Sequence, residues 1–389
     1  MYLTAEEELI LSGEQGPGPQ RAMELLVALG RIYDADRLVP ITSAHLSGVS
    51  YKTIGEGGID FLKEMSKDAK VRVPTTLNPM GMDAERWKEM RVPERFSDRQ
   101  LEIMRCYSSL GVRTTCSCTP YLGDNVPRKG DNIAWAESSA LSYANSVLGA
   151  RTNREGGPGA LAAAILGRTP HYGLHLDENR APTVVIEVED VTGVFEHSLL
   201  GHAVGLSTGA SVPYFKGIRP DQDELKIMAA AMAASGSVAL FHVDGLTPEG
   251  EGRDLDGLEV VRLTKKDLEE VRAKLSVDDA PDLIALGCPH LSVKEIRELA
   301  RLVKGKPRPK ETEVWFCSSR STVAQCPEEV KLLDRFGKVV CDTCMIVAPI
   351  EGTHKVTATN SCKACSYLPG LCSQKVVCQS APRLLEVIT

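Results

Sequence analysis

The stretch Asp282-Leu-Ile-Ala-Leu286-Gly-Cys288-Pro-His290 opens the most regular part of the chain. Its apolar half predicts a buried strand over 282–286, and the spacing of apolar residues beyond the turn predicts a helix over 293–303. A strand over 313–316, a turn at Ser319 and another helix repeat the unit. Strand–turn–helix units build parallel sheets whose ligands gather at the carboxyl ends of the strands, where Cys288 and Ser319 both fall. The sequence therefore predicts an α/β fold.

The same alternation of helical and strand patterns extends outward to the rest of the chain. Helices are predicted over 20–31, 134–148 and 159–166, and strands over 38–41, 184–188, 238–243 and 339–347. The last of these strands places Cys344 in the same sheet as Cys288. We expect three α/β lobes: 1–130 with N-terminal helices, 131–257 with Ala/Gly-rich helices and a ligand loop, and 258–389 with the strand–turn–helix units.

Composition and charge exclude several classes of function. The 389 residues are 43% hydrophobic and carry a formal charge of −7 without a basic run, which argues against a nucleic-acid or lipid surface. The N-terminus has acidic residues where a signal peptide needs basic ones. The longest uncharged stretch, 227–243, is interrupted by Ser235-Gly236-Ser237 and does not predict a membrane span. We expect a cytoplasmic protein whose twelve cysteines are ligands or buried thiols.

Two cysteine pairs near the C-terminus, Cys341-Asp-Thr-Cys344 and Cys362-Lys-Ala-Cys365, have the spacing of a structural zinc site. The first pair lies inside an apolar run, however, where a sheet would already stabilise the chain. Cys118 and Cys288 lie in tight turns far upstream, and three separated cysteines are what an iron–sulfur cluster with one open iron requires. The cysteines therefore allow two interpretations, a zinc-stabilised binding module and a cluster enzyme.

Four segments of the chain resemble the large subunit of the aconitase X family. They include the texts Cys-Thr-Pro-Tyr and Gly-Cys-Pro-His and a long Ala/Ser/Gly-rich stretch, and they span 118–121, 134–157, 172–180 and 287–290. The similarity runs from Ser12 to about Tyr367, and it is greatest to the archaeal phosphomevalonate dehydratase branch of the family. The resemblance implies an aconitase-like, multi-lobe, three-layer α/β architecture with parallel or mixed sheets.

The resemblance also implies the cofactor and a partner. A 4Fe–4S cluster would be held by Cys118, Cys288 and Cys344, with one iron left open for the hydroxyl of the substrate. Cys116 is the alternative to Cys118, because a strand would point both thiols the same way, and Cys341 is the alternative to Cys344. A separate small swivelling subunit would supply the catalytic serine, since 389 residues leave room for the cluster-bearing lobes only.

Several polar residues are predicted to bind a small anionic substrate. The turn Gly48-Val49-Ser50 can present backbone N–H groups and a hydroxyl to a phosphate, and Asn78-Pro79 ends the next strand. Arg151 and Arg154 lie in a glycine-bounded loop and can clamp a carboxylate, although each is equally consistent with a surface salt bridge. The remaining candidates are Ser319 and Lys363.

Glu137 and Ser138 begin a mostly apolar helix and are the predicted catalytic residues. A carboxyl group in apolar surroundings has a raised pKa, as an acid that protonates a departing hydroxyl requires. Without the family resemblance, a first-turn charge and a helix-packing serine are the simpler interpretation.

The reaction implied by the resemblance is loss of water from (R)-5-phosphomevalonate to give trans-anhydromevalonate 5-phosphate, in a modified mevalonate route to isoprenoids. Dehydration of cis-3-hydroxy-L-proline is the alternative within the family, and a phosphate site around residues 48–50 distinguishes the two. The zinc-stabilised module is the alternative from another class, and metal analysis separates it from the enzyme.

Overall fold

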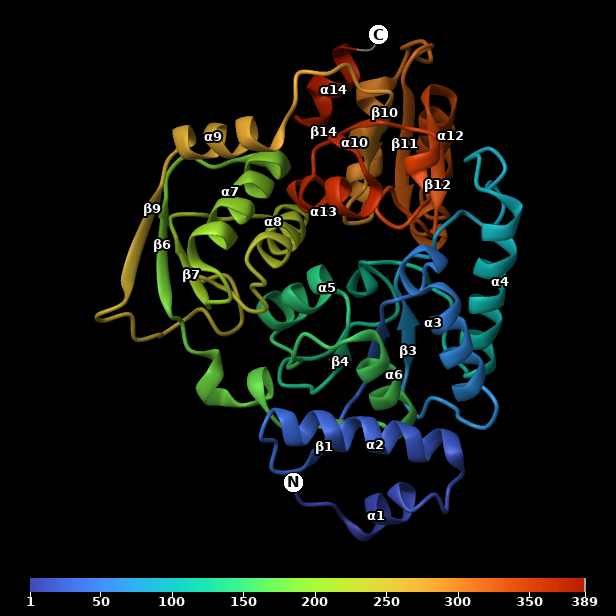
Figure 1. Ribbon diagram of the computed structural model, residues 1–389. Coiled ribbons are helices and arrows are strands. Elements are labelled where there is room, and N and C mark those ends of the chain that lie inside the picture. The colour runs from blue at the N-terminus through green and yellow to red at the C-terminus, as the bar shows by residue number, and fades with distance from the viewer. Residues whose placement is uncertain (388–389) are drawn as a thin grey trace.

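A computed structural model describes residues 1–387 and contains three α/β lobes, each with its own parallel sheet (Figure 1). We name the lobes by their sheets, as the first, second and third lobe in chain order. The α/β prediction is confirmed. In the described part of the chain, no helix combines the length and the apolar character needed to cross a membrane.

The first lobe surrounds a three-stranded parallel sheet of order β3-β2-β4, with an antiparallel pair β1-β5 beside it. Helix α2 begins with proline at its first turn and packs its apolar face against α6. The elements are α1 (Ala5–Leu11), α2 (Pro17–Ile32), β1 (Leu38–Pro40), β2 (Ala44–Leu46), α3 (Tyr51–Met65), β3 (Thr75–Leu77), α4 (Glu94–Ser109), η1 (Pro120–Leu122), β4 (Ala134–Trp135), α5 (Ser138–Tyr143), the π-helical η2 (Ala144–Leu148), α6 (Gly157–Leu166), β5 (Arg168–Pro170), η3 (Gly173–His175) and η4 (Asp177–Arg180).

The second lobe has a four-stranded parallel sheet of order β8-β7-β6-β9. Its helices α7 and α8 lie very close, because a Cβ atom at Gly201 would stand 2.4 Å from the carbonyl oxygen of Met228. The elements are β6 (Val184–Val188), α7 (Gly193–Thr208), β7 (Pro213–Lys216), α8 (Gln222–Ser235), β8 (His242–Val243), β9 (Glu259–Leu263) and α9 (Lys265–Leu275).

The third lobe has a five-stranded parallel sheet of order β12-β11-β10-β13-β14. The predicted helix over 293–303 is present with the same bounds, because Ser292 and Glu295 form a capping box at its start. The elements are β10 (Leu283–Leu286), α10 (Val293–Val303), β11 (Glu313–Ser318), α11 (Arg320–Val323), α12 (Pro327–Phe336), β12 (Lys338–Cys341), η5 (Ile350–Gly352), β13 (Val356–Thr359), α13 (Cys362–Cys372), β14 (Lys375–Cys378) and α14 (Ala381–Val387).

Three predicted elements differ from the structure. The helix predicted over 134–148 is divided into β4, α5 and η2, because residues 134–135 pair with β2. Of the strand predicted over 238–243, only β8 pairs with a neighbour. The strand predicted over 339–347 ends at Cys341, because Asp342 turns the backbone with a φ of 64°. Cys344 therefore lies in the loop after the strand.

Strand pairing crosses both of the divisions predicted between lobes. Strand β4 follows residue 130 and pairs with β2 of the first lobe, and β9 follows residue 257 and pairs with β6 of the second. The three lobes meet around α8, which contacts α5 of the first lobe and α13 of the third (Figure 1). Side chains from all three lobes can therefore reach one centre.

Candidate active site

The structure brings Cys118, Cys288 and Cys344 together from three separate loops. Cys118 precedes η1 in the first lobe, Cys288 follows β10, and Cys344 follows β12. All three side chains are buried. Burial is the main reason that the pKa of each thiol is raised to about 12. The charge of a neighbouring cysteine also raises each pKa: Cys344 that of Cys118, Cys118 that of Cys288, and Cys288 that of Cys344. The three sulfur atoms are thus electrostatic neighbours in a closed environment.

The two alternative cysteines lie beside a different cluster of charges. The backbone N–H of Cys341 donates to Asp83 Oδ2 at 2.8 Å. Burial raises the pKa of Cys116, and the next contribution comes from the nearby Asp342. Asp83 and Asp342 are both paired with Arg320. Cys116 has a φ of 45°, so its segment is not the strand that would point its thiol the same way as that of Cys118.

Glu137 and Lys363 form a buried ion pair at the centre of the site. Lys363 is in the first turn of α13 and donates to Glu137 Oε1 and, at 3.1 Å, to Ser139 Oγ. The carboxylate also accepts from Asn78 Nδ2 at 2.7 Å and from Ser139 Oγ at 3.0 Å. Glu137 is the residue that caps α5, and its side chain accepts from the backbone N–H of Ser139. Four hydrogen bonds therefore fix one carboxylate between two lobes.

The pKa of Glu137 differs in direction from the one predicted from the sequence. Burial alone would raise its pKa, but the charge and hydrogen bond of Lys363, with smaller contributions from Ser139 and His45, lower it to about 2. Burial acts against the charge on Lys363, yet Glu137, Cys288 and Cys118 together raise the pKa of Lys363. The pair is therefore ionised at neutral pH, and the raised pKa expected for Glu137 is wrong, because the sequence did not reveal its partner.

Two of the cysteines have close neighbours with unsatisfied polar atoms. His290 follows Cys288 by two residues, and Thr343 precedes Cys344. Both side chains are buried, and within residues 1–387 neither Nδ1 of His290 nor Oγ1 of Thr343 has a hydrogen-bond partner. Buried polar atoms without partners are uncommon and often mark a place for a ligand.

The turn predicted to bind a phosphate has free backbone donors. In the described chain, the N–H groups of Gly48, Val49 and Ser50 donate to no protein acceptor, and Gly48 has a φ of 77°. The hydroxyl of Ser50 is already used, because it donates to the carbonyl oxygen of Val347 at 2.8 Å. Successive free N–H groups at the start of a helix form a site for an anion. The turn can therefore bind a phosphate with its backbone N–H groups, but not by donation from the hydroxyl of Ser50.

The two arginines predicted to act as one clamp contact different parts of the structure. Arg151 donates to the carbonyl oxygen of His175 at 2.9 Å and pairs with Asp177. Arg154 is exposed and donates to the carbonyl oxygen of Ala233 at 3.1 Å, at the end of α8. The two guanidinium groups thus have different partners.

Among the described residues, neither Ser319 nor Ser138 forms a hydrogen bond with Glu137 or Lys363. Ser319 caps α11, and its Oγ lies 2.8 Å from Oγ1 of Thr322. It lines a cavity of about 590 Å³ that also contains Cys116 and Arg320. Ser138 is half-buried at the start of α5, next to Glu137.

The four cysteines of the zinc pattern are not gathered into one site. Cys341 lies beside Asp83, whereas the thiols of Cys362 and Cys365 are neighbours of Cys378. Across the described residues, no three His, Cys, Asp or Glu side chains are placed to hold a single metal ion. The spacing of the two pairs is therefore not a zinc site in the fold.

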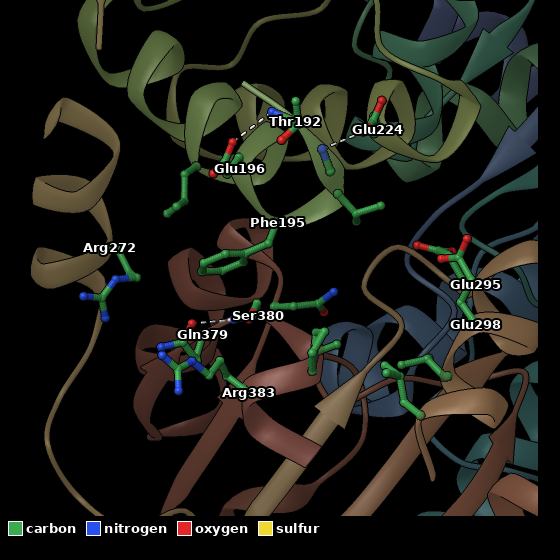
Figure 2. Close-up of a pocket in the computed structure, with 18 of the residues that line it drawn as sticks. Thr192, Phe195, Glu196, Glu224, Arg272, Glu295, Glu298, Gln379, Ser380 and Arg383 are labelled. Atoms are coloured by element: carbon green, nitrogen blue, oxygen red, sulfur yellow. Dashed lines mark hydrogen bonds between the residues drawn. The ribbon is translucent and has the colours of Figure 1, made fainter. Parts of the chain in front are cut away.

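A larger pocket of about 830 Å³ lies between the second and third lobes. Figure 2 shows Thr192, Phe195 and Glu196 on one side of it, and Gln379, Ser380 and Arg383 on the other. Within residues 1–387, none of the predicted site residues lines this pocket. The polar centre around Glu137 and Lys363 is therefore the stronger candidate for an active site.

Most residues of this centre are predictable from the sequence, but two of its members are not. Ser139 has no predicted role, although it contacts both Glu137 and Lys363. His290 also has no predicted role. The signal for Ser139 was its position two residues after a helix-capping acid, where the backbone N–H faces the cap side chain.

Comparisons with known proteins agree along the whole chain. Residues 1–178, 182–273 and 281–389 match the first, second and third domains of aconitase X. The phosphomevalonate dehydratase large subunit of Methanosarcina mazei is 47% identical over 381 residues, which cover 97% of this chain and 94% of the relative.

Two further comparisons concern a structure and a more distant enzyme. The crystal structure of Thermococcus kodakaraensis aconitase X in its holo-form has a TM-score of 0.94 and 45% identity, and the match covers all of both chains. The cis-3-hydroxy-L-proline dehydratase of Pseudomonas aeruginosa is 38% identical, over 96% of this chain and 67% of the relative.

Proposed function

This chain belongs to the aconitase X family, and we propose that it is the large subunit of a hydro-lyase that dehydrates (R)-5-phosphomevalonate to trans-anhydromevalonate 5-phosphate. The observation that carries the proposal is the gathering of three buried cysteines around an ion pair between Glu137 and Lys363. The identity of 47% to the Methanosarcina enzyme, against 38% to the hydroxyproline enzyme, supports this substrate.

The cysteine site suits an iron–sulfur cluster with three protein ligands, Cys118, Cys288 and Cys344. Burial holds all three thiols protonated, with pKa values raised to about 12, so their thiolate forms need positive charge nearby. A cluster fills the space between its ligands, so its cysteines stand further apart than the ligands of a single ion. In the described chain, Nδ1 of His290 and Oγ1 of Thr343 have no hydrogen-bond partner, so both atoms can form hydrogen bonds with a group bound beside the thiols. When bound, a 4Fe–4S cluster with one open iron supplies a Lewis acid for the substrate hydroxyl.

Lys363 is the residue of this centre that we assign to an anionic group of the substrate. An ammonium group has three N–H donors, and in the described structure Lys363 uses them on two acceptors, Glu137 Oε1 and Ser139 Oγ. The third is available to a carboxylate. Glu137 stays ionised, so it orients Lys363 and Asn78 rather than releasing a proton. The hydroxyl of Ser138 at the start of α5 stays a candidate for a contact with the reacting group.

The phosphate of the substrate fits the turn at residues 48–50. Three backbone N–H groups there have no protein acceptor among residues 1–387, and a phosphate needs several such donors. Pro79 follows Asn78 in the loop directly after β3. Of the two arginines, we assign Arg154 to the substrate, because Asp177 already neutralises Arg151. Ser319 stays a proposed substrate contact from the third lobe, at the cavity that it lines with Arg320.

A small subunit that carries the catalytic serine completes the proposal. The Methanosarcina relative is called a large subunit, and the Pseudomonas relative is a longer chain of which this chain covers 67%. A segment beyond the matched part of that longer enzyme can correspond to a separate subunit here. The base that removes the substrate proton would then come from outside this chain.

Anaerobic measurement of iron and acid-labile sulfide tests the proposal. The purified chain should contain both, and should dehydrate phosphomevalonate only after the small subunit is added. Cys288→Ala should remove the iron, whereas Cys326→Ala, a buried cysteine near α11, should retain it. Absence of iron from the wild-type chain would contradict the cluster, full turnover by the chain alone would contradict the partner, and a preference for cis-3-hydroxy-L-proline would contradict the substrate.

A further inference from the structure

We propose that His290 is a positioning residue that ties the three cysteine-bearing loops to one another, an inference that rests on the proposed function because these loops would hold the cluster. His290 is fully buried at 0% exposure and lies two residues after Cys288. It contacts the other two loops through different atoms, and it also contacts the second lobe.

The backbone and the ring of His290 reach the two remaining cysteine loops. Its backbone N–H donates to Cys118 Sγ at 3.2 Å, in the first lobe. Its ring Nε2 lies 3.0 Å from the carbonyl oxygen of Thr343, the residue before Cys344. A carbonyl oxygen only accepts, so Nε2 carries the proton and donates. One residue thus links the loops of Cys118, Cys288 and Cys344.

The carbonyl oxygen of His290 makes the third connection, to the second lobe. It accepts from Lys226 Nζ of α8 at 3.3 Å. Lys226 is itself buried and is held by Glu295, and by Asp223 at 3.2 Å. Figure 2 shows Glu295 at the edge of the interlobe pocket, on the third lobe. The amide, ring and carbonyl of His290 therefore contact one lobe each, and its place depends on all three.

This arrangement has a direct consequence for a bound cluster. Residues that orient metal ligands from behind typically change metal affinity about 10- to 100-fold when they are replaced. The backbone contact to Cys118 also places an N–H on a ligand sulfur, a contact that tunes the properties of iron–sulfur clusters. If the ring loses its bond to Thr343, the Cys344 loop loses a hydrogen bond to the Cys288 loop, while the bond from the Asp342 N–H to the carbonyl oxygen of Ser318 remains.

The chain offers a matched control in His242 of β8. His242 is also fully buried, its Nε2 lies 2.9 Å from the carbonyl oxygen of Arg180, and its Nδ1 has no partner in the described structure. It has the same type of contact as His290, in a place away from the cysteines. His290→Met and His242→Met therefore remove equivalent bonds, and His290→Gln keeps an N–H at similar reach.

The first measurement is the rate at which a chelator removes iron from the anaerobically reconstituted chain. His290→Met should release iron about 10- to 100-fold faster than wild type, whereas His290→Gln and His242→Met should stay within about threefold. The electron paramagnetic resonance spectrum of the cluster should change in His290→Met only. Equal rates and spectra in His290→Met and His242→Met would overturn the inference.

The second measurement uses the metal-free chain, so it does not depend on the cluster. Alkylation of each cysteine is followed by peptide mass spectrometry. Cys344 should react about tenfold faster in His290→Met, the change expected from losing one buried hydrogen bond beside it. Cys118 should be unaffected, because its bond comes from the backbone N–H that the variant keeps, and so should Cys326. If wild type takes up no iron, the proposed function fails, and the alkylation rates still decide the role of His290. An unchanged rate at Cys344 would overturn that role.

Discussion

Replacement of Lys363 by methionine should strongly destabilise the metal-free chain, because it leaves the carboxylate of Glu137 buried without its counter-charge. Glu137 is 8% exposed and Lys363 is 7% exposed, so solvent cannot compensate for the lost charge. Removal of one partner of a buried ion pair typically costs about 3–5 kcal/mol. The hydrogen bonds from Asn78 and Ser139 remain in the variant and keep the expected cost within this range.

The pKa of Glu137 gives a second measure of the same interaction. Its ordinary value is 4.5, and in the folded chain, although burial acts to raise the pKa, Lys363 lowers it to about 2. A difference of about 2.5 corresponds to about 3 kcal/mol. Because the folded-state pKa is the lower one, this stability is fully present above pH 4.5 and is lost as the pH falls toward 2. At pH 7 the variant loses the part that Lys363 supplies, which is the largest of the contributions that lower the pKa.

Urea unfolding of the metal-free chain at pH 7 measures the effect. Lys363→Met should lower the free energy of unfolding by about 3–5 kcal/mol, and the double variant with Glu137→Gln should recover most of the loss. Lys294→Met is the control, because Lys294 is 54% exposed in its pair with Asp221 and should cost less than about 1 kcal/mol. A loss below about 1 kcal/mol in Lys363→Met, or no recovery in the double variant, would refute the reasoning.

Three further predictions concern single positions. Burial raises the pKa of Glu155 from 4.5 to about 7, so the stability that it contributes is present below pH 4.5 and is lost as the pH rises through 7. Glu155→Gln should therefore be about 3 kcal/mol more stable than wild type at pH 8 and equal to it at pH 4 in urea titrations, and an equal gain at both pH values would contradict this assignment. Cys344→Ala should abolish iron binding in a colorimetric iron assay while Cys341→Ala retains it, and the reverse result would exchange the two ligands. Gly287 has a φ of 110°, and a Cβ there would lie 2.1 Å from the carbonyl oxygen of Cys317. Gly287→Ala should cost about 2–4 kcal/mol in thermal or urea unfolding, and wild-type stability would show that the turn relaxes freely.

Local signals account for the elements that the sequence predicts well. Helix α10 has its predicted bounds because Ser292 and Glu295 cap it within one turn and its apolar residues recur at helical spacing. Strand β6 also has its predicted bounds, since four of the five residues in Val184–Val188 are apolar and β-branched. Each of these signals lies inside or beside the element itself.

Elements that depend on distant partners were predicted less well. The stretch 134–148 looks helical by composition, but Ala134 and Trp135 pair with β2, about ninety residues earlier in the chain. The apolar run after Cys341 resembles a continuing strand, yet Met345 and Ala348 are apolar because they belong to the buried core around the cysteine loops. Apolar periodicity reports burial, and several backbone shapes can satisfy it.

The candidate site shows the same limit. Glu137 and Lys363 were both named, but they are 226 positions apart, and no local pattern states that they form a pair. Without the pair, burial alone set the expected direction for the pKa of Glu137. The arginines show the converse: Arg151 and Arg154 are three positions apart but bind Asp177 and the end of α8. Closeness in sequence within an irregular loop does not fix where two long side chains point.

The distribution of the cysteines between the first and third lobes sets a time order for biosynthesis. Cys118 and Cys344 are separated by 226 positions in the chain (344 − 118). At a synthesis rate of about 5–20 residues per second, Cys118 is made roughly 10–45 s before Cys344. A nascent chain that already has its first lobe still lacks two of the three proposed ligands. Under the proposed ligand set, cluster delivery would have to wait until the third lobe has left the ribosome and docked, and cofactor insertion would be a late, post-translational event that reports on completed folding.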